Sequence, residues 1–314
     1  MRGEQKVVVG LGELLWDVFP EGPRLGGAPA NFAVMCGRLG DHAVIASRVG
    51  TDAPGQQARR LLESLPVDLS YLQADAEFAT GTVTVALEEG EPHYTIHEPV
   101  AWDRLAFTHE WRELAGRADA VCVGTLAQRS AISRETILEF LDATRPACVR
   151  IFDVNLRPPF VSAEVLRATL ARATLVKLNA HELPEVLVAT GASPFAARAQ
   201  DEEELLRGAR VLLDRYPARL VCVTMGGEGS LLVTRETFHR HEGVATVVRD
   251  TVGAGDAFTA ALAHGYLEGA TLATMNEAGN RWGAWMASQP GAMPPLPGAT
   301  LAAVTGEIRG KNGR

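Results

Sequence analysis

Short runs of apolar and β-branched residues alternate with longer helix-forming segments along most of this chain. The first apolar run spans residues 6–11, a helix-forming segment follows at 29–39, and a second apolar run spans 42–49. After residue 118 the same pattern predicts strands at 119–123, 147–153, 174–178, 219–224, 230–234 and 244–249. The remaining predicted helices span 56–65, 133–143, 162–170, 181–189, 201–215, 257–268 and 271–288. Strands that alternate with helices are typical of a mainly parallel sheet covered on both faces, so we expect an α/β fold.

Residues 80–97 depart from this alternation, because two strand-like runs follow each other without a helix between them. Thr82–Leu87 and His93–His97 are rich in β-branched residues, and the acidic segment Glu88–Glu91 lies between them. This pattern predicts a β-hairpin. A hairpin inserted into an α/β alternation indicates a small β subdomain of the kind that serves as a lid.

Composition narrows the class of partner. The 314-residue chain carries 30 Lys and Arg residues against 38 Asp and Glu, a formal net charge of -8. The basic residues are scattered, which argues against nucleic acid as a partner. No apolar run reaches the ~20 residues of a membrane helix, and we expect no signal peptide, because the start at residues 1–6 is short and polar. The four cysteines form no CxxC pair, so buried free thiols in a reducing cytoplasm are expected.

Polar and small residues follow several of the predicted strands. Thr125 comes after the strand at 119–123, Asp153 and Asn155 end the next one, and Asn179 follows the third. Ligands of open α/β sheets bind beyond the carboxyl ends of the strands. We therefore expect these side chains to line one crevice.

The segment Asp250–Asp256 (DTVGAGD) is a glycine-rich turn before a predicted helix. Helix N-termini leave backbone N–H groups unpaired, so Gly253, Ala254 and Gly255 are suited to hold an anion such as a phosphoryl group. Asp256 lies where these N–H groups converge and could take a proton from a hydroxyl, although a helix N-terminus should lower its pKa. The alternative is an ordinary turn in which Asp256 caps the helix. The chain contains no G-x-x-x-x-G-K-[ST] phosphate loop.

A second glycine motif lies near the start of the chain. Gly26 and Gly27 would let the backbone approach a ligand closely, and Pro29 suits the first turn of a helix. Asn31 offers a donor and an acceptor, as recognition of a polyol demands. The alternative is a plain turn that precedes a helix.

Together, the segments GGAPANFA (residues 26–33) and DTVGAGDAF (residues 250–258) resemble the paired signatures of the ribokinase-like, or PfkB, carbohydrate kinases. Residues 50–55 (GTDAPG) are similar to the G-x-D-x-x-G segment of that family. The resemblance covers the whole chain. It implies a Rossmann-like three-layer α/β/α sandwich formed by residues 1–314 as a single kinase domain. A small β-sheet lid would come from about residues 13–25 and 79–103, and Asp256 would be the base in ATP-dependent phosphorylation of a sugar.

The resemblance also implies where ATP and metal ions bind. Asn179 and Glu182 match the N-x-x-E motif, which holds Mg2+ through water, although Glu182 could equally be a first-turn helix charge. The predicted nucleotide contacts are Asn179, Thr224, Gly226, Gly227, Gly229 and, in the adenine pocket, Asn280. The alternatives are a hairpin turn for residues 224–229 and close helix packing around Asn280. The backbone carbonyls of Asp250 and Val252 would supply a K+ site.

Within the family, GELLWD (residues 12–17), AWD (101–103) and DVNLRPP (153–159) resemble fructokinase segments. By this resemblance Asp17, Asn155 and Arg157 join Gly26, Gly27 and Asn31 in binding the sugar. Arg157 would compensate the transferred phosphate, because the anion loop (residues 250–256) itself carries no lysine; the alternative is a solvated loop charge. Residues 28–30 lack the lysine of ribokinase-type loops, which disfavours ribose; fructose is expected from the fructokinase-like segments.

Other functions remain open at this point. A 2-keto-3-deoxygluconate kinase or a nucleoside kinase would share the same motifs, and a non-catalytic sugar-binding protein is a further alternative. A nucleotide-dependent oxidoreductase is disfavoured, because no G-x-G-x-x-G follows the first strand. The exposed edges of the predicted lid sheet also suggest a homodimer formed through the lid.

Overall fold

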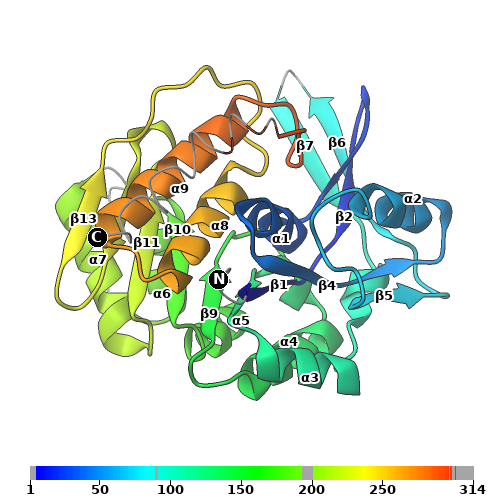
Figure 1. Cartoon of the computed structure of the whole chain (residues 1–314), viewed down its shortest axis with the longest axis horizontal. Helices are drawn as coiled ribbons and strands as arrows, with labels where there is room; N and C mark the ends of the chain where they lie inside the picture. Colours follow the sequence, from blue (N-terminus) through cyan, green and yellow to red (C-terminus); the bar gives the residue numbers. More distant parts are fainter. Residues whose placement is uncertain (1–4, 89–90, 193–200, 297, 299–300, 302–314) are drawn as a thin grey trace.

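A computed structural model describes residues 5–88, 91–192, 201–296, 298 and 301 of the chain. Its main sheet has nine strands in the order β13-β12-β11-β10-β9-β8-β1-β4-β5 (Figure 1). The strands are β1 (Val7–Leu11), β4 (His42–Gly50), β5 (Leu72–Asp75), β8 (Ala120–Val123), β9 (Val149–Asp153), β10 (Leu175–Asn179), β11 (Leu220–Thr224), β12 (Ser230–Val233) and β13 (Phe238–His241). The pairs from β5 to β11 are parallel, and β12 and β13 are added antiparallel.

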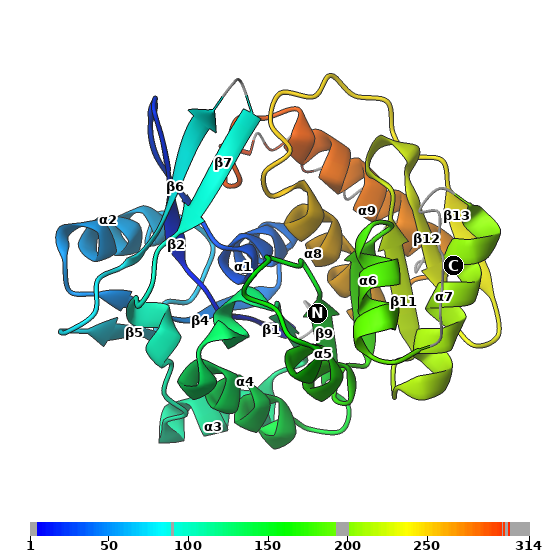
Figure 2. The same ribbon diagram turned by 180° about the vertical axis from the view of Figure 1, so that it is seen from behind.

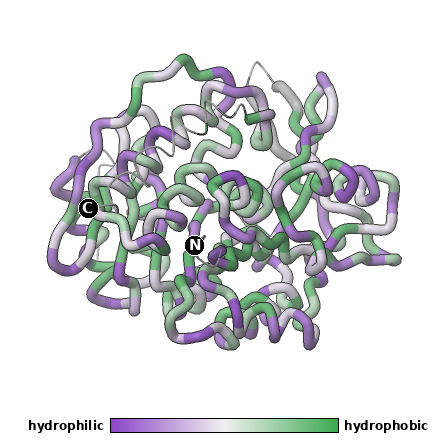
Figure 3. Tube along the Cα trace, viewed as in Figure 1, coloured by the Kyte–Doolittle hydropathy of each residue, from purple (hydrophilic) through white to green (hydrophobic). Residues whose placement is uncertain are grey.

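Helices cover both faces of this sheet, because its strands are apolar on both sides. On one face Val9 packs in a core with Leu114, Phe140 and Leu212. On the other face its neighbour Val8 packs with helix residues such as Trp282. The helices are α1 (Ala28–Leu39), α2 (Ala53–Leu62), α3 (His109–Arg117), α4 (Ala131–Ala143), α5 (Ala163–Leu170), α6 (Glu182–Ala189), α7 (Glu202–Arg215), α8 (Ala254–Leu267) and α9 (Leu272–Ala287). The expected α/β sandwich is confirmed, and hydrophobic segments concentrate in its central strands (Figure 3).

A second sheet stands apart from the main one and has the order β3-β2-β6-β7 (Figure 2). Its strands are β2 (Leu15–Phe19), β3 (Gly22–Gly26), β6 (Gly81–Glu88) and β7 (Glu91–Ile96). The predicted hairpin is present, with Val83 opposite Ile96, although residues 89–90 of its turn lie outside the described part of the chain. We call this four-stranded sheet the lid sheet.

The order of strands locates the ligand edge of the main sheet. β1 has β4 on one side and β8 on the other, so the chain runs outward in opposite directions from the β1–β8 boundary. Ligands of open α/β sheets bind beyond the carboxyl ends of strands at such a point. Gly10 lets the start of α1 sit directly on the end of β1, since a Cβ at Gly10 would lie 2.0 Å from the Pro29 carbonyl oxygen.

One predicted strand is wrong. Residues 244–248 (VATVV) are not a strand, and the edge strand β13 ends before them at His241. Gly243 has a left-handed φ of +88° and turns the chain away from the sheet. Val247 is 81% exposed, so these β-branched residues have neither a partner strand nor a core to pack on. The strands β5 and β13 and the helix α3 were not predicted.

The predictions about cysteines and membrane spans can also be compared with the structure. All four cysteines are buried free thiols, as expected. Among the described residues, no helix is both long and apolar enough to cross a membrane.

Candidate active site

The two glycine motifs of the sequence meet at the ligand edge of the sheet. The start of α8 carries Asp256 and the start of α1 carries Asn31. The Asn31 Nδ2 donates a hydrogen bond of 2.7 Å to the Asp256 Oδ2, although the two residues are 225 positions apart. Asp256 is therefore held by a side chain of the other motif. This contact distinguishes it from a simple helix cap, whose carboxylate would bond to its own helix.

Each glycine of the pair Gly26-Gly27 makes room for a different neighbour. A Cβ at Gly27 would lie 2.4 Å from the Glu13 carbonyl oxygen, and Gly27 also has a left-handed φ of +111°. A Cβ at Gly26 would lie 2.8 Å from the Asp17 Oδ2. The first contact lets the loop pack on the chain after β1, and the second leaves space for the carboxylate of a lid-sheet residue. The pair thus brings Asp17 to the same place as Asn31.

In the anion loop, residues 250–256, only some of the N–H groups are free of hydrogen bonds. The Ala254 N–H donates to the Thr251 carbonyl at 3.2 Å. The N–H groups of Gly253 and Gly255 have no acceptor within the described part of the chain. Gly253 adopts a left-handed φ of +79°, as the residue that precedes this helix requires. Two of the three predicted anion donors therefore remain available at the positive end of α8.

A buried lysine lies beneath this loop, and sequence reasoning missed it. The Lys177 Nζ donates to the Asp153 Oδ1 at 3.0 Å, and the Thr259 Oγ1 donates to the Asp153 Oδ2 at 2.8 Å. A Cβ at Gly255 would lie only 3.0 Å from the Lys177 Nζ. The anion loop lacks a lysine in sequence, but β10 supplies one in space. The available signal was a lysine inside the apolar run at 174–178, where a charged residue needs a partner.

Charge and burial set the protonation of these groups. Lys177 has an ion-pair partner in contact, the Asp153 carboxylate. Burial alone would lower the pKa of Lys177, but Asp153 and Glu182 reverse this and raise it. Burial and the nearby Asp153 raise the pKa of Asp256 from 3.8 to about 6, while Asn31 partly opposes them. The expected lowering at the helix N-terminus is therefore wrong, because the loss of solvation outweighs the helix dipole.

Asn179 and Glu182 form a reciprocal pair at the start of α6. The Asn179 Oδ1 accepts from the Glu182 N–H at 2.9 Å, and the Glu182 Oε2 accepts from the Asn179 N–H at 2.8 Å. The Glu182 Oε1 accepts from the Leu156 N–H at 2.7 Å. This is the geometry of a capping box. Both carboxylate oxygens already have a backbone donor, and no cluster of three acidic, His or Cys ligands occurs in the described ranges, so the pair fits Mg2+ through water rather than directly.

The loop after β9 carries the predicted residues Asn155 and Arg157. Asn155 is the non-glycine residue found with a positive φ in the described ranges, at 43°, and its carbonyl accepts from the Thr125 Oγ1 at 3.0 Å. Such strained backbone is common at binding sites. Arg157 is exposed and donates to the Leu156 carbonyl, yet it lowers the pKa of both Asp17 and Asp256. Its charge therefore acts on the site from the solvent side.

The predicted nucleotide loop joins β11 to β12. Thr224 ends β11 beside Asn179 of β10. Gly226, Gly227 and Gly229 form a tight turn, in which the Met225 N–H donates to the Gly229 carbonyl at 2.8 Å. A Cβ at Gly229 would lie 1.9 Å from the His241 carbonyl oxygen, so this glycine is required by the close approach of the next loop.

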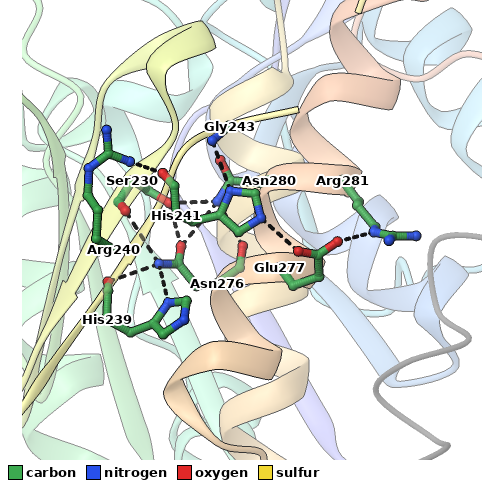
Figure 4. Close-up of polar contacts among 9 residues, drawn as sticks. All are labelled: Ser230, His239, Arg240, His241, Gly243, Asn276, Glu277, Asn280 and Arg281. Atoms are coloured by element: carbon green, nitrogen blue, oxygen red, sulfur yellow. Dashed lines mark hydrogen bonds and ion pairs between the residues drawn. The ribbon is translucent and has the colours of Figure 1, made fainter. Parts of the chain in front are cut away.

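Asn280 lies in a buried polar network between α9 and β12 (Figure 4). Its Nδ2 donates to the Ser230 Oγ at 2.7 Å and to the Asn276 carbonyl at 2.8 Å. On the outer side of the network the Gly243 N–H donates to the His241 Nδ1 at 2.9 Å, and the His241 Nε2 contacts Glu277 at 2.7 Å. The network thus fastens the end of β13 to α9 and supports the glycine loop. Its polar groups bond mainly to one another.

Asp250 connects the anion loop to the lid sheet. Its Oδ1 accepts from the Val252 N–H at 3.0 Å, and its Oδ2 accepts from the Gly291 N–H at 3.0 Å. Arg24 of β3 donates to the same Oδ2 at 2.8 Å. No hydrogen bond to the carbonyl oxygens of Asp250 and Val252 is found within residues 201–296, so both carbonyls are compatible with the predicted K+ site.

Phosphoryl transfer to a hydroxyl needs a proton acceptor, hydrogen-bond donors for the phosphoryl oxygens and nearby positive charge. The site brings together a carboxylate with a raised pKa, free N–H groups at the start of a helix and a buried cation beneath them. The predicted sugar and anion-loop residues meet at this edge, with Asn179 and Glu182 at the ends of neighbouring strands. Glu13, Lys177 and Arg24 were not predicted as site residues, and Asp153 was expected only to line the crevice. Asn280 lies in a separate network near the glycine loop.

Known proteins with the same organisation are carbohydrate kinases. The fructokinase of Klebsiella pneumoniae is 32% identical over 306 residues, which cover 91% of this chain and 95% of the relative. The aminoimidazole riboside kinase of Salmonella typhimurium is 27% identical over 95% of this chain and 93% of its own length. The structure of the Vibrio cholerae fructokinase with fructose, ADP and calcium superposes with a TM-score of 0.78, at 26% identity and over 96% of this chain and 98% of that one. The model of the pfkB family carbohydrate kinases matches residues 22–299, and the chain belongs to that family.

Proposed function

We propose that this kinase transfers the γ-phosphoryl group of ATP to a hydroxyl of fructose. The observation that supports the chemistry best is the Asp256 carboxylate, which Asn31 holds beside the free N–H groups of the anion loop. Asp256 takes the proton of the acceptor hydroxyl, whose oxygen forms a bond to the γ-phosphorus. The bond between that phosphorus and the β–γ bridging oxygen breaks, and ADP leaves.

The anion loop stabilises the charge that develops on the transferred group. Gly253 and Gly255 donate from their backbone N–H groups, and Ala254 joins them when its bond to Thr251 opens. Lys177 contributes positive charge from below the loop, since its Nζ lies close to Gly255. Arg157 supplies a second positive charge from the solvent side. These fixed charges need little reorganisation during transfer, which is why such sites accelerate the reaction.

The sugar lies between the rim of the main sheet and the lid sheet. Asp17, Asn31 and Asn155 bind its hydroxyls, and Gly26 and Gly27 allow the ring to approach the backbone. The segments 13–25 and 79–103 act as a lid within a single kinase domain. Closure of the lid excludes water, so the sugar hydroxyl is the acceptor in place of water.

ATP lies along the carboxyl ends of β10 and β11. Thr224, Gly226, Gly227 and Gly229 contact the nucleotide, and Asn280 approaches it from α9. Asn179 and Glu182 would hold Mg2+ through water, and this ion would supply positive charge beside the phosphates of ATP. The carbonyls of Asp250 and Val252 would hold K+. Two further proposals are a homodimer paired through the lid-sheet edges β3 and β7 and a cytoplasmic location, which suits four free thiols.

The choice of fructose is supported by the fructokinase relatives and by a loop at residues 28–30 without lysine. A nucleoside is the second candidate, because the aminoimidazole riboside kinase of Salmonella typhimurium is also similar over most of its length. The test is ADP formation by the purified protein with Mg2+ and ATP, offered fructose, ribose, 2-keto-3-deoxygluconate, adenosine and aminoimidazole riboside. We expect the largest kcat/KM for fructose. A preference for a nucleoside would overturn the substrate, and no ADP formation with any acceptor would overturn the kinase activity.

The rate should depend on pH through Asp256. Only the ionised carboxylate can accept a proton, and its pKa in the folded protein is about 6. We therefore expect kcat/KM for the sugar to fall roughly tenfold for each pH unit below that value and to be level above it. The measurement is a profile between pH 5 and pH 9, with the KM for ATP determined at each pH to separate protonation of the nucleotide. A level profile down to pH 5 would contradict the role of Asp256 as the base.

A further inference from the structure

Glu13 is a buried carboxyl group beside the proposed sugar site, to which no role has yet been given. It is separated from the end of β1 by Gly12 alone and is only 3% exposed. Its carbonyl oxygen packs against Gly27, at the point where the loop 26–27 crosses the end of β1. The chain thus places Glu13 beneath the glycine pair and next to the start of α1. Burial of a carboxyl group in this position costs free energy unless its oxygens accept hydrogen bonds.

One simple explanation is that Glu13 only caps α1. The N-cap residue Gly27 has no side chain to serve this purpose, and the Ala28 N–H lowers the pKa of Glu13, as a nearby donor would. This contact accounts for part of the carboxylate. It leaves the Oε2 unexplained, because that atom is buried and has no hydrogen-bond partner among the described residues.

A second unpartnered acceptor lies in the same place. The Asn31 Nδ2 is bonded to Asp256, but the Asn31 Oδ1 is buried without a partner in the described part of the chain. Buried polar atoms are nearly always hydrogen-bonded, so two orphan acceptors near one carboxylate require explanation. Both atoms are acceptors, so they cannot hydrogen-bond to each other when Glu13 is ionised. Each needs a donor from another group. A ligand with several hydroxyl groups provides such donors.

The charged side chains that act on Glu13 also belong to the proposed sugar site. The pKa of Glu13 is raised from 4.5 to about 7, because burial and the charge of Asp256 outweigh the lowering by its own N–H, Arg157 and the Ala28 N–H. The two charged side chains that act on Glu13 are therefore the proposed base and the arginine at the mouth of the sugar site. A purely structural cap would gain from a low pKa, whereas this carboxyl group carries an uncompensated cost of burial in the ligand-free protein.

We propose that the Glu13 Oε2 accepts a hydrogen bond from a sugar hydroxyl other than the one that is phosphorylated. This inference rests on the proposed function, because it assigns a contact within the same sugar site. Glu13 and Asn31 would then bind neighbouring hydroxyls on either side of the acceptor oxygen, while Asp256 takes its proton. Glu13 is a specificity-determining residue in this arrangement. Sugars that lack that one hydroxyl are discriminated against because a buried acceptor stays unpaired.

The test compares Glu13→Ala and Glu13→Gln with the unaltered protein, using fructose and its series of monodeoxy analogues. With fructose, Glu13→Ala should lower kcat/KM roughly 10- to 100-fold, mainly through a higher KM, the usual effect of losing one hydrogen bond to a buried charged group. Glu13→Gln keeps an acceptor oxygen and the same shape, so its loss should be smaller. Glu139→Gln, an exposed carboxylate on α4, is the matched control and should behave like the unaltered protein.

The analogues separate direct contact from a structural effect. For one deoxy sugar, which lacks the hydroxyl that Glu13 binds, the unaltered protein and Glu13→Ala should give the same kcat/KM. For the other analogues the variant should retain its full loss. An equal loss with every analogue means that Glu13 acts only as a cap, and an unchanged kcat/KM with fructose also overturns the proposal. If the unaltered protein phosphorylates none of the sugars tested, the proposed function is wrong, and the proposed contact of Glu13 is wrong as well.

Discussion

Asp256→Asn should abolish sugar phosphorylation, with kcat lowered by roughly 10²- to 10⁴-fold. The asparagine keeps the shape and can still accept the hydrogen bond that Asn31 donates to Asp256 at 2.7 Å. It cannot accept the proton of the sugar hydroxyl. The measurements are the rate of ADP formation at saturating substrates and the affinity for ATP and fructose by calorimetry. Both affinities should stay within a few-fold of their values in the unaltered protein.

Asp256→Asn should also make the ligand-free protein more stable at high pH. This gain in stability would show that the variant is inactive because it lacks the base and not because it misfolds. The pKa of Asp256 rises from 3.8 to about 6 on folding, so the folded state binds more protons in that window. Stability is therefore lost as pH rises through it, and the full cost, on the order of 2–3 kcal/mol, is present at pH 8. Asp256→Asn removes that cost at pH 8 and changes little at pH 4. Asp214→Asn, an exposed carboxylate on α7, is the control, and a near-normal rate in Asp256→Asn would refute the mechanism.

Lys177→Met should destabilise the fold by about 3–5 kcal/mol, because it removes one partner of a buried ion pair. Asp153 is only 4% exposed and would keep its hydrogen bond from Thr259 but lose the ammonium group of Lys177. The measurement is unfolding in urea at pH 7. The loss of this cation should also raise the pKa of Asp256 further, since Lys177 lowers it in the unaltered protein. The acid limb of the pH profile should accordingly move to higher pH.

The double variant Lys177→Met/Asp153→Asn tests whether the ion pair is the cause. Removal of both charges leaves no uncompensated buried ion, so most of the lost stability should return. The activity should stay low, because the anion loop has still lost the cation beneath it. Equal destabilisation in the single and double variants would mean that the lysine acts by packing alone.

Much of the fold follows from local pattern. The apolar runs at 119–123 and 174–178 are strands because both of their sides are buried, and such runs are hard to mistake. The hairpin at 82–97 was equally clear, since its strands pair with each other across a short turn. The run at 244–248 was misread because the preference of valine for strands depends on a neighbouring strand, and none is available beyond β13.

The site was predictable where a residue acts through its backbone or its motif. Gly27 and Gly253 have conformations that favour glycine, and the motifs around them led to Asn31 and Asp256. Interactions between distant segments were not predictable. Lys177 meets Asp153 across two strands, and the pKa of Asp256 depends on burial by elements far along the chain. The sequence of the segment 250–256 alone does not show which distant residues contact or bury Asp256.

The hydrogen bond between Asn31 and Asp256 also bears on when the protein becomes active during its synthesis. The N-terminal part of a chain emerges from the ribosome first, so α1 is available long before α8 has been made. A nascent chain that already contains β1, α1 and the lid strands, which end at Ile96, has the proposed sugar site without its proposed base, and it gains Asp256 only after about 160 more residues. We therefore expect incomplete chains not to consume ATP, and a fragment cut between α1 and α8 to be inactive unless both pieces reassemble.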